Sequence, residues 1–340
     1  MPVSSREWHL ATRPIGQPKP TDFACITTTV ADPGPDQILV RNDWLSVDPY
    51  MVGRLNAGKS RLSDIPPYET GEALTGGAVG TVIASHADTV PVGAIVSHFL
   101  GWREYALLPA NTVQVVDTAP VPAQSYLGVL GVTGLTAYAA LTVIAPVKAG
   151  DVVYVSAAAG AVGSVAGQIA KHLGASRVIG SAGGPDKIRR LVEDFGYDTG
   201  LDYRAGNLPA QLATAAPGGI DVYLDNVGGD HLQAALGAMN VGGRIALCGA
   251  ISALSDGPLP PGPSNLPLVI GKRLTLRGIN VADHYDLLAD YTEHAIAWLQ
   301  DGSLGSQETV VDGIDNAVEA LLTMMGGANT GKMLIRLPPA

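Results

Sequence analysis

The sequence predicts an α/β protein of two domains, because two different patterns of apolar and polar residues follow one another along its 340 residues. Up to about Pro120, short apolar runs such as QILVRN and GTVIAS are interrupted by proline and glycine, which is typical of a β-rich, barrel-like unit. After Pro146, strand, turn and amphipathic helix alternate, which indicates a parallel sheet covered by helices on both faces. A chain of this length usually exceeds one hydrophobic core, and its apolar fraction of 46% can fill a second.

The elements of the second part can be placed from their apolar patterns. Strands are predicted in the segments VVYVS, SRVIGSA, GIDVYLDNV, GGRIALCGA and LTLRGIN. Helices are predicted where apolar residues recur at helical spacing, along Val162, Val165, Ile169 and Leu173, along Leu288, Tyr291, Ala295 and Trp298, and along Ile314, Val318, Leu321 and Met325. The strand-like KMLIRL ends the pattern, and the proline-rich run from Gly257 to Pro267 is expected to be a loop inside the α/β region.

Composition and charge argue against several classes of protein. The chain has 21 basic and 31 acidic residues, a formal net charge of −10, and no basic run that could follow a nucleic-acid backbone, so no nucleic-acid partner is expected. Charges and proline in MPVSSREWHLATRP interrupt the apolar core that a secretory signal would need. The two cysteines, Cys25 and Cys248, are too few for a disulfide framework. A cytoplasmic location is therefore expected. The uncharged segment from Thr118 to Val147 contains glycine, proline and polar residues, which favours packed structure over a membrane span.

The run SAAAGAVGS, Ser156 to Ser164, joins a predicted strand to a predicted helix without any large side chain. Ala158, Gly160 and Gly163 fall on the frame G-x-G-x-x-G, with alanine in the first place. Glycine at the second place lets the backbone approach a pyrophosphate, and glycine at the third lets the helix pack on the strand. The sequence therefore predicts a dinucleotide site here, against the alternative of a tight turn that binds nothing.

The end of the second predicted strand indicates which dinucleotide is bound. A free ribose 2′-hydroxyl is usually held by an acid about 20 residues after the glycine turn, at that strand end. This chain has GSAGG there, and the nearest acid, Asp186, follows Pro185 and stands beside Lys187. A 2′-phosphate is therefore the better partner and NADPH is favoured over NADH, although Lys187 alone could be an ordinary solvated charge.

Several motifs resemble those of a known family. SAAAGAVGS, GIDVYLDNVGG, GRIALCGAIS and NTGKMLIR, with GLTAY and LSVDPYM, look like the zinc-independent medium-chain reductases of the prostaglandin/leukotriene reductase and alkenal double-bond reductase group. This resemblance runs nearly from end to end. It implies a GroES-like catalytic domain formed by residues 1–130 and 304–340, with a Rossmann NADPH-binding domain of residues 131–303 inserted between them. Proteins of the group are often homodimers, so a homodimer is expected.

The resemblance also implies which residues hold the cofactor. Lys187 and Tyr203 would hold the 2′-phosphate. The pyrophosphate and the remainder of the cofactor would lie along Gly160, Ala161, Val162 and Gly163, and along Asn226, Cys248, Gly249, Ala250, Ile251, Ser252, Ile279, Asn280, Val281 and Asn329. Each position also has an ordinary structural interpretation: the asparagines as turn formers, Tyr203 as a surface aromatic residue and Ile279 as core.

No metal is expected. Two cysteines cannot supply a structural zinc site with four Cys ligands, and no two of the seven histidines stand at metal spacing. Where zinc enzymes of the superfamily carry Gly-His-Glu, this chain has Gly71, Glu72 and Ala73. Cys25 and Cys248 are expected to be small apolar core residues.

The implied activity is NADPH-dependent reduction of the C=C bond of an α,β-unsaturated aldehyde or ketone, the small-molecule partner. Hydride goes to the β-carbon and a proton to the α-carbon. Reduction of quinones, or NADPH binding without catalysis, are the alternatives. In the group a tyrosine commonly stands in the loop where this chain has Leu254, and an arginine where it has Val52. Tyr50 is therefore the candidate proton donor, unless it only packs in the site.

Overall fold

The computed structural model describes residues 2–57, 65–250 and 261–338. The chain divides into two compact units, unit 1 of Met1–Gly128 with Glu308–Ala340, and unit 2 of Val129–Gln307. The predicted α/β class with a β-rich unit and a Rossmann unit is confirmed. Among the described residues, no helix has the length and apolar character needed to cross a membrane.

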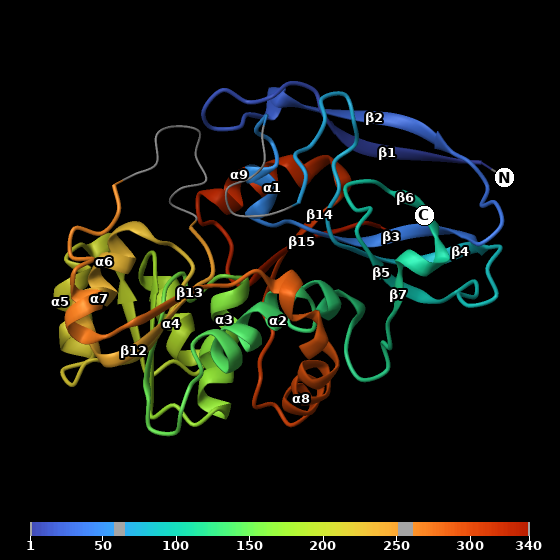
Figure 1. Cartoon of the computed structure of the whole chain (residues 1–340). Coiled ribbons are helices and arrows are strands. Elements are labelled where there is room, and N and C mark those ends of the chain that lie inside the picture. Colours follow the sequence, from blue (N-terminus) through green and yellow to red (C-terminus); the bar gives the residue numbers. More distant parts are fainter. Residues whose placement is uncertain (1, 58–64, 251–260, 339–340) are drawn as a thin grey trace. The chain divides into compact units, whose positions relative to one another are not determined.

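Unit 1 is built mainly of antiparallel strands (Figure 1). Strands β1 (Val3–Leu10) and β2 (Phe23–Val30) form a hairpin-like pair. A larger sheet has the order β14 (Glu308–Asp312), β15 (Lys332–Arg336), β3 (Gln37–Ser46), β4 (Ala78–Ser85), β5 (Ile95–His98) and β7 (Gln114–Val115), with β6 (Tyr105–Pro109) also on β3. Its helices are α1 (Tyr50–Gly53) and α9 (Ala317–Met325), and its 3₁₀ turns are η1 (Pro20–Asp22), η2 (Ala110–Thr112), η3 (Ala123–Leu127) and η8 (Ile314–Asn316).

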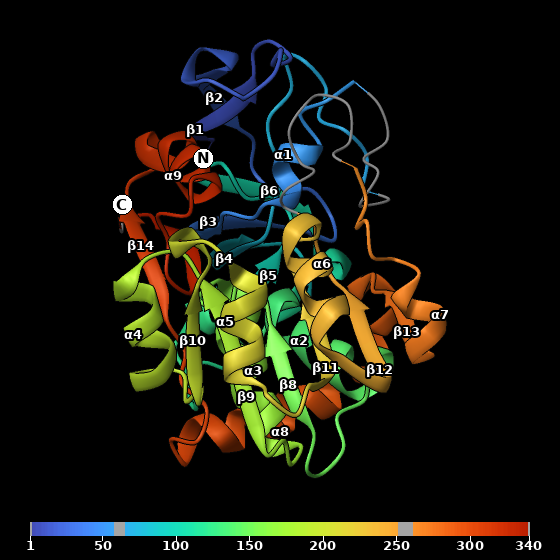
Figure 2. The same cartoon turned by 90° about the vertical axis from the view of Figure 1, so that its left-hand side faces the viewer.

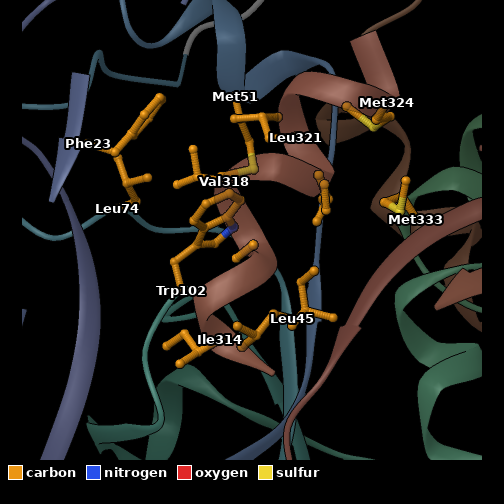
Figure 3. Close-up of a cluster of buried hydrophobic side chains, with 14 of the residues drawn as sticks. Phe23, Leu45, Met51, Leu74, Trp102, Ile314, Val318, Leu321, Met324 and Met333 are labelled. Carbon is orange, nitrogen blue, oxygen red and sulfur yellow. The ribbon is translucent and has the colours of Figure 1, made fainter. Parts of the chain in front are cut away.

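The last segment of the chain completes the core of unit 1. The predicted helical stripe of the tail forms η8 and α9, and its apolar side chains surround the buried ring of Trp102 (Figure 3). The Trp102 indole donates a hydrogen bond of 3.2 Å to the carbonyl of Ser46. Strand β15, predicted as KMLIRL, pairs with β3 so that Leu334 lies opposite Ser46. Residues from both ends of the sequence therefore share a single core.

The prediction that Cys25 is a core residue was wrong. Cys25 lies on β2 and is exposed. Strands β1 and β2 form a separate two-stranded sheet in which β1 also bridges to Arg103 and Ala73, whereas the middle of β2 turns its side chains to solvent. Cys248 is half-buried in unit 2.

Unit 2 is a parallel sheet with helices on both faces (Figure 2). Its order is β10 (Thr199–Asp202), β9 (Arg177–Ala182), β8 (Val152–Val155), β11 (Ile220–Asp225), β12 (Met239–Leu247) and β13 (Thr275–Gly278). Numbered along the unit, this is the order 3-2-1-4-5-6 of a Rossmann sheet. The helices are α2 (Val132–Ala139), α3 (Ala161–His172), α4 (Pro185–Glu193), α5 (Leu208–Ala215), α6 (Gly229–Ala238), α7 (Leu268–Lys272) and α8 (Leu288–Gln300), with the turns η4 (Ala140–Ile144), η5 (Tyr203–Ala205) and η7 (Val281–Leu287).

The central strands of this sheet are buried on both faces, which explains why a strand such as β8 is a continuous apolar run. On one face, Tyr154, Ile179, Tyr223 and Ile245 pack in one cluster with α5 and α6. On the other face α3 lies close to the sheet, because Gly167 of α3 and Gly180 of β9 both contact the ring of Tyr197. The sheet thus holds the ends of its strands, and the loops that follow them, in fixed positions.

Candidate cofactor site

The candidate site lies where the strand order of unit 2 reverses. Strands β8 and β11 are neighbours in the middle of the sheet, and the strands that follow each of them lie on opposite sides. In open sheets of this kind, ligands bind at the carboxyl ends of the strands at such a switch point. The turn after β8 is the SAAAG run and the turn after β11 is DNVGG. Both were singled out from the sequence, and the topology makes them neighbours.

The turn after β8 has the geometry that a pyrophosphate requires. Ala157 takes a φ of +47°, and the Gly160 amide donates to its carbonyl over 2.9 Å. A methyl group at Gly163 would lie only 2.5 Å from the Ala157 carbonyl oxygen, so glycine is needed for α3 to pack on this turn. Helix α3 has neither a side-chain cap nor an acidic residue in its first turn. Its N-terminal amides, from Ala161 onward, therefore remain suited to an anion.

The turn after β11 looks similar in sequence but differs in chemistry. The Asp225 carboxylate accepts hydrogen bonds from the amides of Val227 and Gly228, at 3.0 and 2.8 Å, at the entrance to α6. A further acid, Asp230, stands in the first turn of α6. These carboxylates oppose a phosphate at α6. Of the two helix entrances, the one at α3 is therefore the better suited to a phosphate.

Hydrogen bonds tie the loops after β8, β11 and β12 together. The Asn226 amide donates to the Ser156 hydroxyl over 2.9 Å, and the Asn226 side chain donates to the Ser156 carbonyl over 2.7 Å. The amides of Cys248 and Gly249 donate to the Asp225 carbonyl over 2.8 and 3.0 Å. A methyl group at Gly249 would lie 2.9 Å from the Asn226 carbonyl oxygen. Asn226, Cys248 and Gly249, three of the predicted cofactor residues, are thus brought together.

The Cys248 thiol is placed to stay protonated. Burial, and then the charge of Asp225, raise its pKa to about 12. A thiol in this state is a poor nucleophile and a poor metal ligand.

Of the other predicted cofactor residues near these loops, the structure describes some and not others. The Ile279 amide donates to the Leu247 carbonyl over 3.1 Å, so the chain beyond β13 starts beside the end of β12. Asn280 caps η7, which begins at Val281, by accepting from the Ala282 amide. Ala250 is half-buried. Ile251 and Ser252, as well as Leu254 and most of the proline-rich loop, lie outside the described residues.

The predicted 2′-phosphate residues gather beyond the end of β9. That strand ends at Ala182 and is followed by Gly183 and Gly184, so the strand itself supplies no acid for a 2′-hydroxyl. A methyl group at Gly183 would lie 2.9 Å from the Tyr203 hydroxyl and 2.7 Å from Nε of Arg204. Burial, and then the charge of Arg204, lower the pKa of Lys187. Tyr203 and Arg204 therefore lie beside Gly183, the charge of Arg204 acts on Lys187, and two cations that repel each other are suited to an anion.

Asp202 positions this cationic cluster. Its Oδ1 accepts from the Gly184 amide over 2.9 Å and from the Arg204 amide over 3.0 Å. The carboxylate thereby joins the start of α4, which carries Lys187, to the turn that carries Tyr203 and Arg204. Through these two hydrogen bonds, Asp202 holds the two loops together.

Two predicted residues, Tyr50 and Asn329, belong to unit 1. Tyr50 begins α1 and stacks on Phe99 with 6.3 Å between ring centroids. The Asn329 side chain donates to the Gly331 carbonyl over 2.8 Å, in the loop before β15. A buried ion pair of 2.8 Å between Lys332 and Asp48 joins the segments that carry these two residues.

Two protein families match the chain: the N-terminal domain of oxidoreductase over residues 6–116, and the zinc-binding dehydrogenase over residues 161–301. The chain is 37% identical over 338 residues to the NADPH-dependent curcumin reductase of Escherichia coli (strain K12), covering 98% of this chain and 97% of that protein. It is 36% identical over 338 residues to the NADP(+)-dependent 2-alkenal reductase of Nicotiana tabacum, with 98% and 97% covered. A crystal structure of CurA in complex with NADPH from Vibrio vulnificus matches with a TM-score of 0.92 and 36% identity, over 98% of this chain and all of that one. The chain belongs to the medium-chain dehydrogenase/reductases.

Within this family the reductase belongs to the zinc-independent group that the motifs indicated, since its relatives include 2-alkenal, pulegone and prostaglandin reductases. Among residues 2–57, 65–250 and 261–338, no group of three or more His, Cys, Asp or Glu side chains could hold a metal ion.

The sequence interpretation missed Arg204 and Asp202. Arg204 directly follows Tyr203 in LDYR, so a signal was present: a basic residue beside the tyrosine already assigned to the 2′-phosphate. Asp202 gave no comparable signal, because an acid at a strand end followed by an aromatic and a basic residue is common at protein surfaces. The three-dimensional position beside Gly184 is what gives it a role.

Proposed function

We propose that this reductase uses NADPH to reduce the C=C bond of α,β-unsaturated aldehydes or ketones. The observation that carries the proposal is the pair of anion sites in unit 2: the glycine turn at α3 for a pyrophosphate, and the cluster of Lys187, Tyr203 and Arg204 for a 2′-phosphate. Relatives that match nearly the whole chain are named for reduction of curcumin and of 2-alkenals with NADP(H), which supports the substrate class.

NADPH, when bound, supplies the hydride for the β-carbon of the substrate. The chain supplies the rest. Gly160 and the N-terminal amides of α3 hold the pyrophosphate, and the cationic cluster holds the 2′-phosphate. We assign to Tyr50 the delivery of the proton to the α-carbon, directly from its hydroxyl. The remaining predicted contacts, Asn226, Cys248 to Ser252, Ile279 to Val281 and Asn329, are proposed to line the nicotinamide half of the cofactor.

A substrate panel tests the proposal. Enals, enones, nitroalkenes and quinones are each incubated with the full chain and NADPH, and cofactor oxidation is followed at 340 nm. We expect steady turnover with enals or enones and a saturated carbonyl product. Hydroquinone as the main product would instead establish quinone reduction. Binding of NADPH with no turnover across the panel would leave a non-enzymatic binding protein.

We also propose that catalysis needs no metal. The support is the residue at the position where zinc relatives of the superfamily carry histidine, which is Glu72 in this chain. Activity should survive exhaustive chelation, and elemental analysis should find well under one zinc per chain. Stoichiometric zinc whose removal abolishes turnover would overturn this proposal.

For the assembly we propose a cytoplasmic homodimer. Strand β13 is an edge strand of the unit 2 sheet, and Ile270, in the helix just before it, exposes 81% of its surface. An open sheet edge beside an exposed apolar residue favours pairing with a second copy. Cys25 and Cys248 are both free thiols, which fits a reducing compartment. Light scattering of the unmodified chain and of Ile270→Glu tests the dimer, and cell fractionation tests the location.

A further inference from the structure

Asp225 is a buried carboxylate whose hydrogen-bond donors are all uncharged groups. The residue is 1% exposed. Its Oδ1 accepts from the Tyr223 hydroxyl over 2.8 Å and from the Ser156 hydroxyl over 3.3 Å, besides the two amides at the entrance to α6. Among the described residues no lysine, arginine or histidine forms an ion pair with it; its charge acts to raise the pKa of the nearby buried His231, but burial outweighs this and leaves that pKa lowered. Buried charges are normally paired with an opposite charge or a metal, so this carboxylate lacks its usual partner.

Its position is at the switch point of the sheet. Asp225 ends β11, and the next residue, Asn226, is bonded to Ser156 at the start of the glycine turn. The backbone carbonyl of Asp225 also holds the amides of Cys248 and Gly249. The Asp225 residue is therefore bonded directly to the loops that are proposed to line the cofactor.

We propose that the Asp225 carboxylate stabilises the oxidised cofactor relative to the reduced one, an inference that rests on the NADP(H) site proposed above. The two forms carry the same phosphates and differ in charge only at the nicotinamide ring, which is cationic when oxidised and neutral when reduced. A buried anion held by neutral donors attracts that cation through a medium of low dielectric constant. Because positive charge develops on the ring as hydride leaves, the same attraction favours hydride transfer. Asp225 would thus be a positioning and electrostatic residue that acts without touching the substrate.

A purely structural role would give a different signature. If Asp225 only holds the loops in place, its loss weakens binding of both cofactor forms by the same factor. If its charge acts on the ring, its loss weakens NADP⁺ more than NADPH. The ratio of the two dissociation constants separates these roles without any measurement of turnover.

The test is calorimetric titration of NADP⁺, and fluorescence titration of NADPH, with the unmodified chain and with Asp225→Asn. The control is Tyr223→Phe, which removes one donor to the same Oδ1 and keeps the charge. We expect Asp225→Asn to weaken NADP⁺ at least about tenfold more than NADPH, which corresponds to a charge–charge attraction of about 1.4 kcal/mol. Tyr223→Phe should change both forms by a similar factor. An equal loss for both forms in Asp225→Asn would overturn the proposal.

Two further measurements keep the result decisive. Adenosine 2′,5′-bisphosphate lacks the nicotinamide ring, so its affinity should follow that of NADPH in the variants; a selective loss of this probe would also overturn the proposal. If Asp225→Asn does not fold, Asp225→Ser retains an oxygen that can accept from the loop amides, and it should show the same selectivity. These titrations contain no enone. Failure of the enone panel and failure of the Asp225 proposal are therefore separate results.

Discussion

The substitution Gly163→Ala tests the glycine turn most directly. The added methyl carbon would lie 2.5 Å from the Ala157 carbonyl oxygen and 2.6 Å from Cα of Ala158. Since such contacts are not tolerated below 3.0 Å, the atoms must separate by 3.0 − 2.5, or 0.5 Å, at the least. Both neighbours are backbone, and hydrogen bonds of 2.9 Å from the Gly160 and Ala158 amides hold them in place. The helix itself must therefore move.

The magnitude follows from this geometry. Forcing one methyl group into packed backbone typically costs about 1–3 kcal/mol, and we expect that loss in the free energy of unfolding. The displaced helix N-terminus should also bind the pyrophosphate less well, by roughly tenfold or more, since every 1.4 kcal/mol is a factor of ten. Urea denaturation without cofactor measures the first effect, and fluorescence titration of NADPH measures the second.

Gly160→Ala is the matched comparison. Its methyl group would meet only the Ala157 carbonyl oxygen, at 3.2 Å, and the φ of Gly160 is −84°, which alanine adopts without strain. We expect near-normal stability but weaker NADPH binding, because the methyl group occupies the space through which the backbone approaches the phosphates. If Gly163→Ala unfolds at the same urea concentration as the unmodified chain, the reasoning about helix packing is refuted.

Three further outcomes are expected. Lys187→Ala should reduce the catalytic efficiency with NADPH about ten- to a hundredfold and leave that with NADH nearly unaffected, because a hydrogen bond to a charged group contributes roughly 1.5–3 kcal/mol. Its control is Arg189→Ala, which removes an exposed, ion-paired residue of the same helix. Equal losses with both cofactors would contradict the assignment of Lys187. Tyr50→Phe keeps the ring and should lower turnover at least about tenfold with little change in KM, whereas unchanged turnover would transfer the proton delivery to water. Because the pKa of the Cys248 thiol is raised to about 12, little thiolate is present at pH 8, and the rate of its alkylation by N-ethylmaleimide should keep rising above pH 9. Peptide mass spectrometry measures this rate, and a rate that levels off near pH 9 would show an ordinary thiol.

Much of unit 2 could be predicted because the central strands of its sheet are buried on both faces. A central strand such as β8 then becomes an uninterrupted apolar run, and helix α3 shows its buried stripe through Val165 and Ile169. Strand β10 was missed. It is a short edge strand, TGLD, in which only Leu201 is buried, so neither alternation nor an apolar run marks it.

The candidate site could be predicted where function depends on local sequence. The turn at α3 has to be free of bulk, and that requirement is visible in SAAAGAVGS itself. The cationic cluster is different, because it joins the start of α4 to the turn after β10. Lys187 was noticed in the sequence only as a basic residue beside Asp186, Tyr203 was found only through resemblance to a family, and Arg204 was overlooked beside them. Proximity across two loops leaves no periodic signal in one sequence.

Asp225 shows why a motif alone could not distinguish the two helix entrances. SAAAG and DNVGG both follow a central strand, both contain glycine and both open a helix. From sequence, the acid in DNVGG can be a turn former, a ligand or a solvated charge. The structure places its carboxylate on the amides of Val227 and Gly228, so this entrance is already occupied by an anion of the chain itself. The negative charge of Asp225 disfavours a phosphate at α6, and we propose that the same charge attracts the cationic ring of the oxidised cofactor. A single acid can then both direct the pyrophosphate to α3 and favour the oxidised form of the bound cofactor.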